Sequence, residues 1–191
     1  MVERVAPLCG SARTAHHNFV FLEGVKAALT ADEIWRSGKD EKPTVGLRAV
    51  ARVYAGWGFS QPFYRDELWR QLDFASLEEF LVGFWEGFWL KRDPANLLAM
   101  LSTWQGADIS ANPIFNGDFK AAMKAITCPA IIMPAEIDLY FPKEDSADEV
   151  ALMSNAVLDV IPGHWGHFAG GGLNPVDTKY IDDALKRLLA Q

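Results

Sequence analysis

The sequence predicts an α/β fold in which a small parallel sheet is interrupted by a long helical insertion. Short apolar runs at residues 2–8, 130–133 and 156–161 are typical of buried strands. Helical periodicity instead dominates from about residue 15 to about residue 126. After that point strand and helix alternate as β-α-β-α, which is typical of a parallel sheet.

The first strand, Val2 to Leu8, begins almost at residue 1 and ends at a glycine-containing turn. Because strands of parallel sheets are buried on both sides, it is expected to need neighbours that the chain before it does not supply.

The insertion is expected to hold a series of amphipathic helices. Ser76 and Glu79 have the spacing of a capping box, and Asp93 with Pro94 has the pattern of a helix start. Aromatic residues are frequent in the helix that follows Ser76, either as core packing or as the lining of an apolar pocket under a helical lid. The expected helices cover residues 18–29, 43–58, 63–72, 77–90, 94–104 and 118–126.

The C-terminal part is expected to contain helices at 142–153 and 176–190 and a glycine-rich loop at 161–172. The acidic first turn of the former helix suits the helix dipole. The loop contains two histidines and directly follows a strand, where glycine allows close backbone approach to a ligand.

Composition excludes several classes of protein. The chain has 191 residues, half of them hydrophobic, and a net charge of −7, which fits one globular domain with a real core. It has no basic stripe typical of nucleic-acid binding, no apolar run of about 18 residues that could span a membrane, and no signal-peptide pattern. We therefore predict a cytoplasmic protein. Cys9 and Cys128 lack metal-type spacing and are expected to be buried thiols.

Asp138 and His167 each follow a predicted parallel strand at its carboxyl end, one βαβ unit apart. That edge carries the active sites of open α/β sheets. The sequence therefore predicts that Asp138 orients His167, as two parts of a Ser-His-Asp system. His164 lies closer to the strand end and stays open as the base.

Other polar residues are less suited to chemistry. His16 and His17 precede the first helix and are expected in an exposed cap region, although His17 could reach a pocket. Asp145 and Asp148 belong to the acidic start of a helix and are expected to be solvated.

A nucleophile is harder to find. The nucleophile elbow has the pattern G-x-S-x-G between a strand and a helix. Ser60 has a glycine two residues before it but Pro62 two residues after it, and it lies among helices, so we reject it. Ser11 lies in a strand-end turn but lacks the elbow glycines. No phosphate-binding glycine loop occurs either.

Several motifs resemble the homoserine O-acetyltransferase-like branch of the α/β-hydrolase superfamily. The resemblance spans essentially the whole chain, 1–191, but only the C-terminal part of the family's domain. The motifs are residues 9–14 (CGSART), 21–25 (FLEGV), 54–61 (YAGWGFSQ), 138–142 (DLYFP) and 165–170 (WGHFAG).

The resemblance implies a partial α/β-hydrolase fold with about three parallel strands and a helical lid over about residues 15–126. It assigns Asp138 and His167 as the family's acid and base, which selects His167 over His164. The family's nucleophilic serine and first strands would lie upstream of Met1.

The implied activity is ester or thioester hydrolysis, or acyl transfer, by a Ser-Asp-His mechanism of which only Asp138 and His167 are present. Members acting on homoserine usually carry Asp after the catalytic histidine; here Phe168 favours a hydrolase or another acceptor. No cofactor is implied, although acyl-CoA could be the acyl donor. The chain alone is expected to be inactive, and an inactive fragment or partner-binding half-domain is the alternative. A small ester or thioester is the expected substrate; a homodimer or a separate N-terminal half stay open as partners.

Overall fold

The computed structural model describes residues 2–190, which divide into two compact units. The first contains the residues up to Arg13, the segment Gly58–Pro62 and the residues from Asp108 onward. The second contains Thr14–Trp57 and Phe63–Ala107. The predicted strands all belong to the first unit, and most of the predicted insertion belongs to the second.

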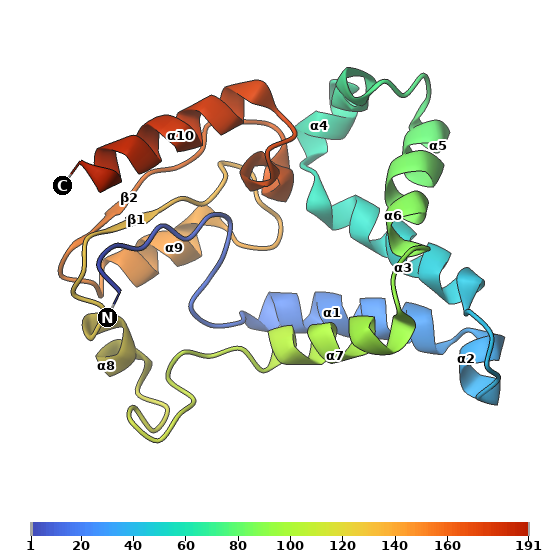
Figure 1. Ribbon diagram of the computed structural model, residues 1–191, viewed down its shortest axis with the longest axis horizontal. Coiled ribbons are helices and arrows are strands. Elements are labelled where there is room, and N and C mark those ends of the chain that lie inside the picture. The colour runs from blue at the N-terminus through green and yellow to red at the C-terminus, as the bar shows by residue number, and fades with distance from the viewer. Residues whose placement is uncertain (1, 191) are drawn as a thin grey trace. The chain divides into compact units, whose positions relative to one another are not determined.

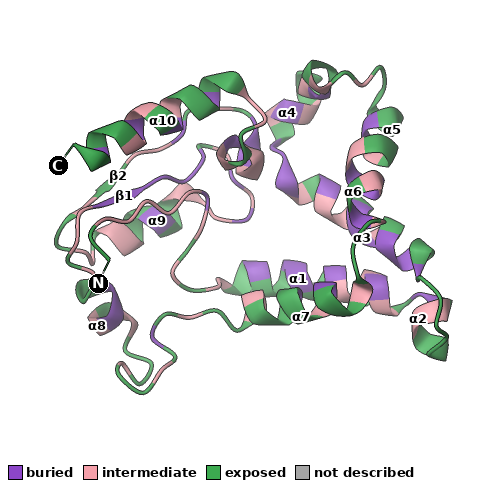
Figure 2. Ribbon diagram, viewed as in Figure 1, coloured by how far each residue is buried: buried purple, intermediate pink, exposed green. Residues whose placement is uncertain are grey.

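The sheet of the first unit has two parallel strands, β1 (Ala130–Ile132) and β2 (Ala156–Leu158), with Ala130 opposite Ala156. Helix α9 (Lys143–Val150) connects them, and α10 (Pro175–Leu189) follows β2 (Figure 1). Strand β1 is buried along its length (Figure 2), as expected for a strand covered on both faces. A short helix, α8 (Phe119–Lys124), precedes β1 and is capped by Asp118, whose carboxylate accepts from the amide of Ala121.

The predicted first strand pairs with β1 only through isolated parallel bridges, Val5 with Ala130 and Leu8 with Met133. Pro7, between the bridges, has no N–H to donate, which interrupts the ladder. The expectation of about three strands is therefore met by two strands and one bridging segment. The predicted strand at 156–161 is also shorter than expected: β2 ends at Leu158, and Ile161 adds one isolated bridge to Ala135.

The second unit is helical. Helices α1 and α7 pack side by side in it (Figure 1). Its buried aromatic side chains include Phe80, Trp85 and Trp89, as expected for core packing. The elements are α1 (His16–Thr30), α2 (Glu33–Ser37), α3 (Thr44–Gly58), α4 (Gln61–Arg65), η1 (Leu68–Leu72), α5 (Leu77–Phe80), η2 (Leu81–Glu86), α6 (Gly87–Trp89) and α7 (Pro94–Gln105); α3 ends and α4 begins within Gly58–Pro62 of the first unit.

Three details of these helices differ from the prediction. Helix α2 was not expected. The helix predicted at 63–72 is split, because Glu67 adopts a left-handed φ of 52° between α4 and η1. The helix after Ser76 contains a π-helical segment, η2.

The serine half of the predicted capping box is confirmed, since Ser76 Oγ accepts from the amide of Glu79 at 3.2 Å. The carboxylate of Glu79 accepts from the amide of Ala75 instead of Ser76.

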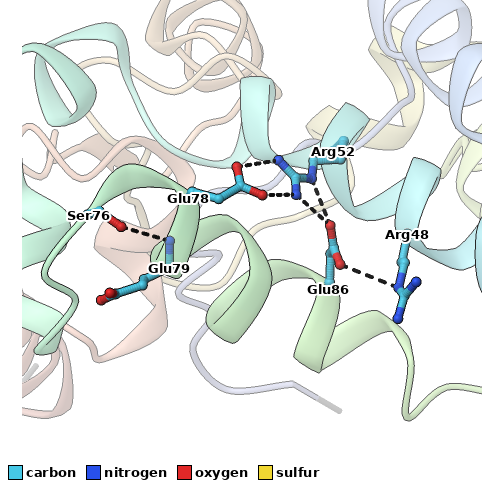
Figure 3. A network of polar contacts seen from close by, with 6 residues as sticks. All are labelled: Arg48, Arg52, Ser76, Glu78, Glu79 and Glu86. Carbon is cyan, nitrogen blue, oxygen red and sulfur yellow. Dashed lines mark hydrogen bonds and ion pairs between the residues drawn. The ribbon is translucent and has the colours of Figure 1, made fainter.

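A charged network joins α3 to α5 and η2 (Figure 3). Arg52 donates to both carboxylate oxygens of Glu78, at 3.0 and 2.7 Å, and to Glu86 at 2.8 Å. Arg48 lies 3.5 Å from the other oxygen of Glu86. Because Glu86 is 8% exposed, these arginines satisfy a carboxylate that would otherwise be buried without a counter-charge.

No helix among residues 2–190 is both long enough and apolar enough to cross a membrane.

Candidate functional site

Asp138 lies in the turn that leaves β1. Its Oδ1 accepts hydrogen bonds from the amides of Tyr140 at 2.8 Å and Phe141 at 3.1 Å. Such a turn, in which an aspartate binds the backbone two and three residues on, is a local feature of the sequence itself. It fixes one carboxylate oxygen and leaves Oδ2 facing the chain segment that follows β2. The Asp138 side chain has no exposed surface.

His167 lies on a short 3₁₀ helix, η3 (Gly166–Gly171), after β2. Its Nδ1 is 3.0 Å from Asp138 Oδ2, which confirms the predicted pairing of the two side chains. Two aromatic rings flank the imidazole: Tyr140 in a T-shaped arrangement with a centroid distance of 4.8 Å, and Phe141 tilted at 45° with a centroid distance of 5.6 Å. With Nδ1–H donated to the carboxylate, Nε2 carries the lone pair, as a general base requires. The side chain is 32% exposed, so solvent reaches part of the ring.

The segment Gly58–Pro62 braces the loop that holds His167. Ser60 Oγ donates to the carbonyl of His164, and Phe59 stacks on Phe168 at 4.4 Å with an interplanar angle of 15°. Gly166 adopts a left-handed φ of 59°, and a Cβ there would lie 2.7 Å from the Ser60 amide nitrogen. The glycine is therefore required both by its backbone conformation and by the approach of another backbone.

These contacts indicate a structural role for Ser60. Its hydroxyl is fully buried and donates to a carbonyl, in keeping with its rejection as a nucleophile. Ser11 Oγ likewise donates to the carbonyl of Arg13 at 2.9 Å. The long-range pairing of Ser60 with the loop had no sequence signal, because nothing local to residues 58–62 specifies contact with residues 104 positions later.

The remaining candidates do not join the dyad. His164 is exposed, and it meets Ser60 through its backbone carbonyl. His16 and His17 are exposed on α1, as expected, and His17 contacts the ring of Trp57 at 4.9 Å. Asp145 and Asp148 are also exposed, as expected for the start of α9.

Cys9 joins the dyad, which the sequence analysis did not anticipate. Cys9 Sγ, an oxygen of Asp138 and a ring nitrogen of His167 all lie within 4.8 Å of one another. Cys9 is buried, as predicted, whereas Cys128 is half-buried. Burial, followed by the nearby charge of Asp138, raises the pKa of the Cys9 thiol to about 12, so the thiol is protonated at neutral pH. A signal for this cluster was present, because Cys9, Asp138 and His167 each follow one of the three predicted strands.

Comparison with proteins of known structure identifies the fold of the chain. No protein-family model matches the chain. A solved acetylester hydrolase from Corynebacterium glutamicum superimposes with a TM-score of 0.94 at 31% identity, covering 100% of this chain and 55% of that one. The chain has a partial α/β-hydrolase fold. This confirms the predicted fold class.

Two curated proteins are similar in sequence. The chain is 33% identical over 190 residues to a Corynebacterium glutamicum protein named "Probable esterase", covering 98% of this chain and 53% of that protein. It is 31% identical over 195 residues to an ethyl acetate hydrolase of Pseudomonas veronii, covering 99% of this chain and 54% of that protein. The chain thus spans about half the length of these relatives.

Homoserine O-acetyltransferases are more distant. The one from Trichormus variabilis is 24% identical over 178 residues, covering 88% of this chain and 48% of that protein. The similarity to α/β-hydrolases is therefore as expected, but it is stronger to esterases than to the acetyltransferases whose branch the sequence motifs suggested.

Proposed function

We propose that this chain is the acid–base part of an α/β-hydrolase esterase that cleaves short-chain acyl esters. The observation that carries the proposal is the contact of 3.0 Å between Asp138 Oδ2 and His167 Nδ1 at the carboxyl ends of β1 and β2. A carboxylate that orients an imidazole in this way forms two parts of the serine-hydrolase mechanism. The names of the two similar proteins, a probable esterase and an ethyl acetate hydrolase, support an ester substrate.

In the proposed reaction, His167 Nε2 removes the proton from a serine hydroxyl as the serine oxygen attacks the ester carbonyl. His167 then gives that proton to the departing alcohol, and the cycle repeats with water to release the acid. Asp138 is a positioning residue, which holds the ring through Nδ1 and stabilises the imidazolium. The two amides on Asp138 Oδ1 keep this carboxylate in place during proton transfer.

The serine is proposed to come from outside these 191 residues, from a longer reading frame or a separate chain. No serine of the sequence lies in the elbow pattern. Ser60, the nearest approximation to it, donates its hydroxyl to the backbone of the loop.

Hydrolysis is favoured over acyl transfer to homoserine by the residue that follows His167. Family members that act on homoserine usually carry Asp at this position, whereas Phe168 provides an apolar ring that stacks on Phe59. Water, or an uncharged alcohol, is the acceptor that suits such a surface.

The test begins with the genomic DNA on the 5′ side of the Met1 codon, where we expect an in-frame G-x-S-x-G. The serine-containing protein should hydrolyse p-nitrophenyl acetate, and the 191-residue chain alone should show only the background rate. His167→Gln should lower kcat by about 10⁴-fold or more, and Asp138→Asn by about 10⁴-fold.

His164→Gln is the matched control, because it removes an exposed histidine three residues from His167. Its activity should equal that of the parent protein. Equal losses in the two histidine variants, or full activity in His167→Gln, would contradict the proposed roles. An upstream stop codon with no elbow, together with no esterase activity under any condition, would instead favour the alternative of an inactive, partner-binding half-domain.

A further inference from the structure

The cluster of Cys9, Asp138 and His167 has the composition of a metal site. A thiol, a carboxylate and an imidazole are the three ligand types that Zn²⁺ prefers in proteins. They come from three separate chain segments of one unit, the bridging segment before β1, the turn after β1 and the helix η3 after β2. Cys9 and Asp138 are buried and His167 is partly exposed.

The distances suit a small tetrahedral ion. Zn²⁺ binds sulfur at about 2.3 Å and nitrogen or oxygen at about 2.0–2.2 Å, so neighbouring ligand atoms lie roughly 3.2–3.8 Å apart. Asp138 Oδ2 and His167 Nδ1 are already 3.0 Å apart, and the thiol sulfur is within 4.8 Å of both groups. A shift of about 1 Å at the sulfur would complete three bonds to one ion.

Charge balance also favours a divalent cation. A thiolate and a carboxylate carry two negative charges, and the imidazole ligand is neutral, so one divalent ion makes the cluster neutral overall. Neutrality matters here because an uncompensated charge next to the unexposed carboxylate of Asp138 would be costly.

We propose that Cys9, Asp138 and His167 bind Zn²⁺ or another thiophilic divalent cation, and that this cation switches the dyad off. The ion forms bonds to Cys9 Sγ, Asp138 Oδ2 and His167 Nδ1. The thiol proton leaves to solvent, and the single proton of the neutral imidazole moves from Nδ1 to Nε2. With Nε2 protonated and Nδ1 bound to metal, His167 has no lone pair with which to accept a proton from a nucleophile.

Binding of the cation depends only on these three side chains. Its effect on catalysis rests on the function proposed above. The inhibited state is reversible, because a chelator removes the ion and restores the hydrogen bond between Asp138 and His167.

Co²⁺ is the probe for the binding test, because its thiolate complexes absorb in the near ultraviolet and its tetrahedral complexes absorb in the visible. Titration of the reduced, metal-free 191-residue protein should give both signals and saturate at about one equivalent, and Zn²⁺ should abolish them by displacement. Cys9→Ser should remove the thiolate band and weaken binding by about 100-fold or more, since even outer-shell changes cost 10–100-fold. Cys128→Ser, the matched control at the other free thiol, should keep the band unchanged.

Absence of a thiolate band in the parent protein, or its loss in Cys128→Ser with retention in Cys9→Ser, would overturn the proposal. If Cys9→Ser does not fold, as judged by circular dichroism, His167→Gln decides the question. It changes a partly exposed ligand and must weaken Co²⁺ binding by a similar factor; unchanged affinity would contradict the site.

The activity measurement separates this inference from the proposed function. In the serine-containing protein, Zn²⁺ should inhibit hydrolysis, and Cys9→Ser should raise the Zn²⁺ concentration for half-inhibition about 100-fold. A protein that binds Co²⁺ through Cys9 but never hydrolyses an ester sustains the metal site and refutes the function. A protein that hydrolyses esters at an undiminished rate in saturating Zn²⁺ refutes the metal site and sustains the function.

Discussion

Replacement of Gly166 by alanine should destabilise the first unit more than the same change at Gly172, although both glycines have left-handed backbones in the same loop. The φ angles are 59° and 76°. Placing an L-residue in this region costs about 1–2 kcal/mol, and the loss of glycine's freedom in the unfolded chain returns about 0.4–1 kcal/mol. This conformational term is common to both variants.

Only Gly166 adds a steric term. A Cβ at Gly166 would lie 2.7 Å from the Ser60 amide nitrogen, 3.0 Å from the Phe59 carbonyl carbon and 3.1 Å from the Phe59 Cα, whereas a Cβ at Gly172 meets nothing within 4 Å. The obstructing atoms are backbone and cannot rotate away. Overpacking of this kind typically costs about 1–3 kcal/mol, so Gly166→Ala should be less stable than Gly172→Ala by that amount.

Thermal unfolding followed by circular dichroism measures the difference. For a chain of this size, 1 kcal/mol corresponds to about 2–4 °C in Tm, so the two variants should differ by about 2–12 °C. Equal Tm values would refute the reasoning, since they would mean that residues 59–60 do not restrict the loop at Gly166.

Other substitutions test the remaining contacts. Glu86→Gln should lower the free energy of unfolding, measured in urea, by about 1.5–3 kcal/mol, because it removes charge-assisted hydrogen bonds from a buried carboxylate. Glu78→Gln should have a smaller effect, because the Glu78 side chain that pairs with Arg52 is exposed to solvent. Ser60→Ala should cost about 0.5–1.5 kcal/mol through its lost hydrogen bond, and a neutral result would show that this hydroxyl does not brace the loop. Burial raises the pKa of the Asp177 carboxyl in the folded protein, so ionisation of this carboxyl opposes folding. As pH rises above about 4, the pKa of the carboxyl in the unfolded chain, Asp177→Asn should therefore become more stable relative to the parent protein. A difference in urea stability that does not change with pH would contradict this.

Sequence patterns predicted the elements whose signals are local. The helix start at Asp93 is capped as expected, because a cap is decided by residues two or three apart. Asp118 also caps α8, in a region where only a helix was predicted. The positions of Asp138 and His167 were predictable because both follow apolar runs, and parallel strands end at a common edge. The order of strand and helix predicted that Asp138 lies near the loop after the next strand, and the family resemblance then selected His167 over His164.

Features set by distant partners were not predictable. The π-helical segment η2 ends at Glu86, whose carboxylate accepts a hydrogen bond from Arg52 on α3. No pattern within residues 81–86 specifies that contact. Pro7 shortened the first strand although its apolar run looked continuous. Cys9 is a different case: its place after the first predicted strand was a signal, but it was judged only by its spacing from Cys128, which cannot detect a site whose ligands come from three strand ends.

The contacts that align the dyad are all independent of a nucleophile. Asp138 is fixed by two amides of its own turn, and the loop that carries His167 is fixed by Ser60 and by the close approach at Gly166. All of these groups belong to the first unit. The alignment of His167, the proposed base, therefore follows from the fold of these residues and does not require the proposed serine. The same pre-alignment brings a thiol, a carboxylate and an imidazole together among these residues. This geometry makes the proposed metal site a property of the 191-residue chain itself.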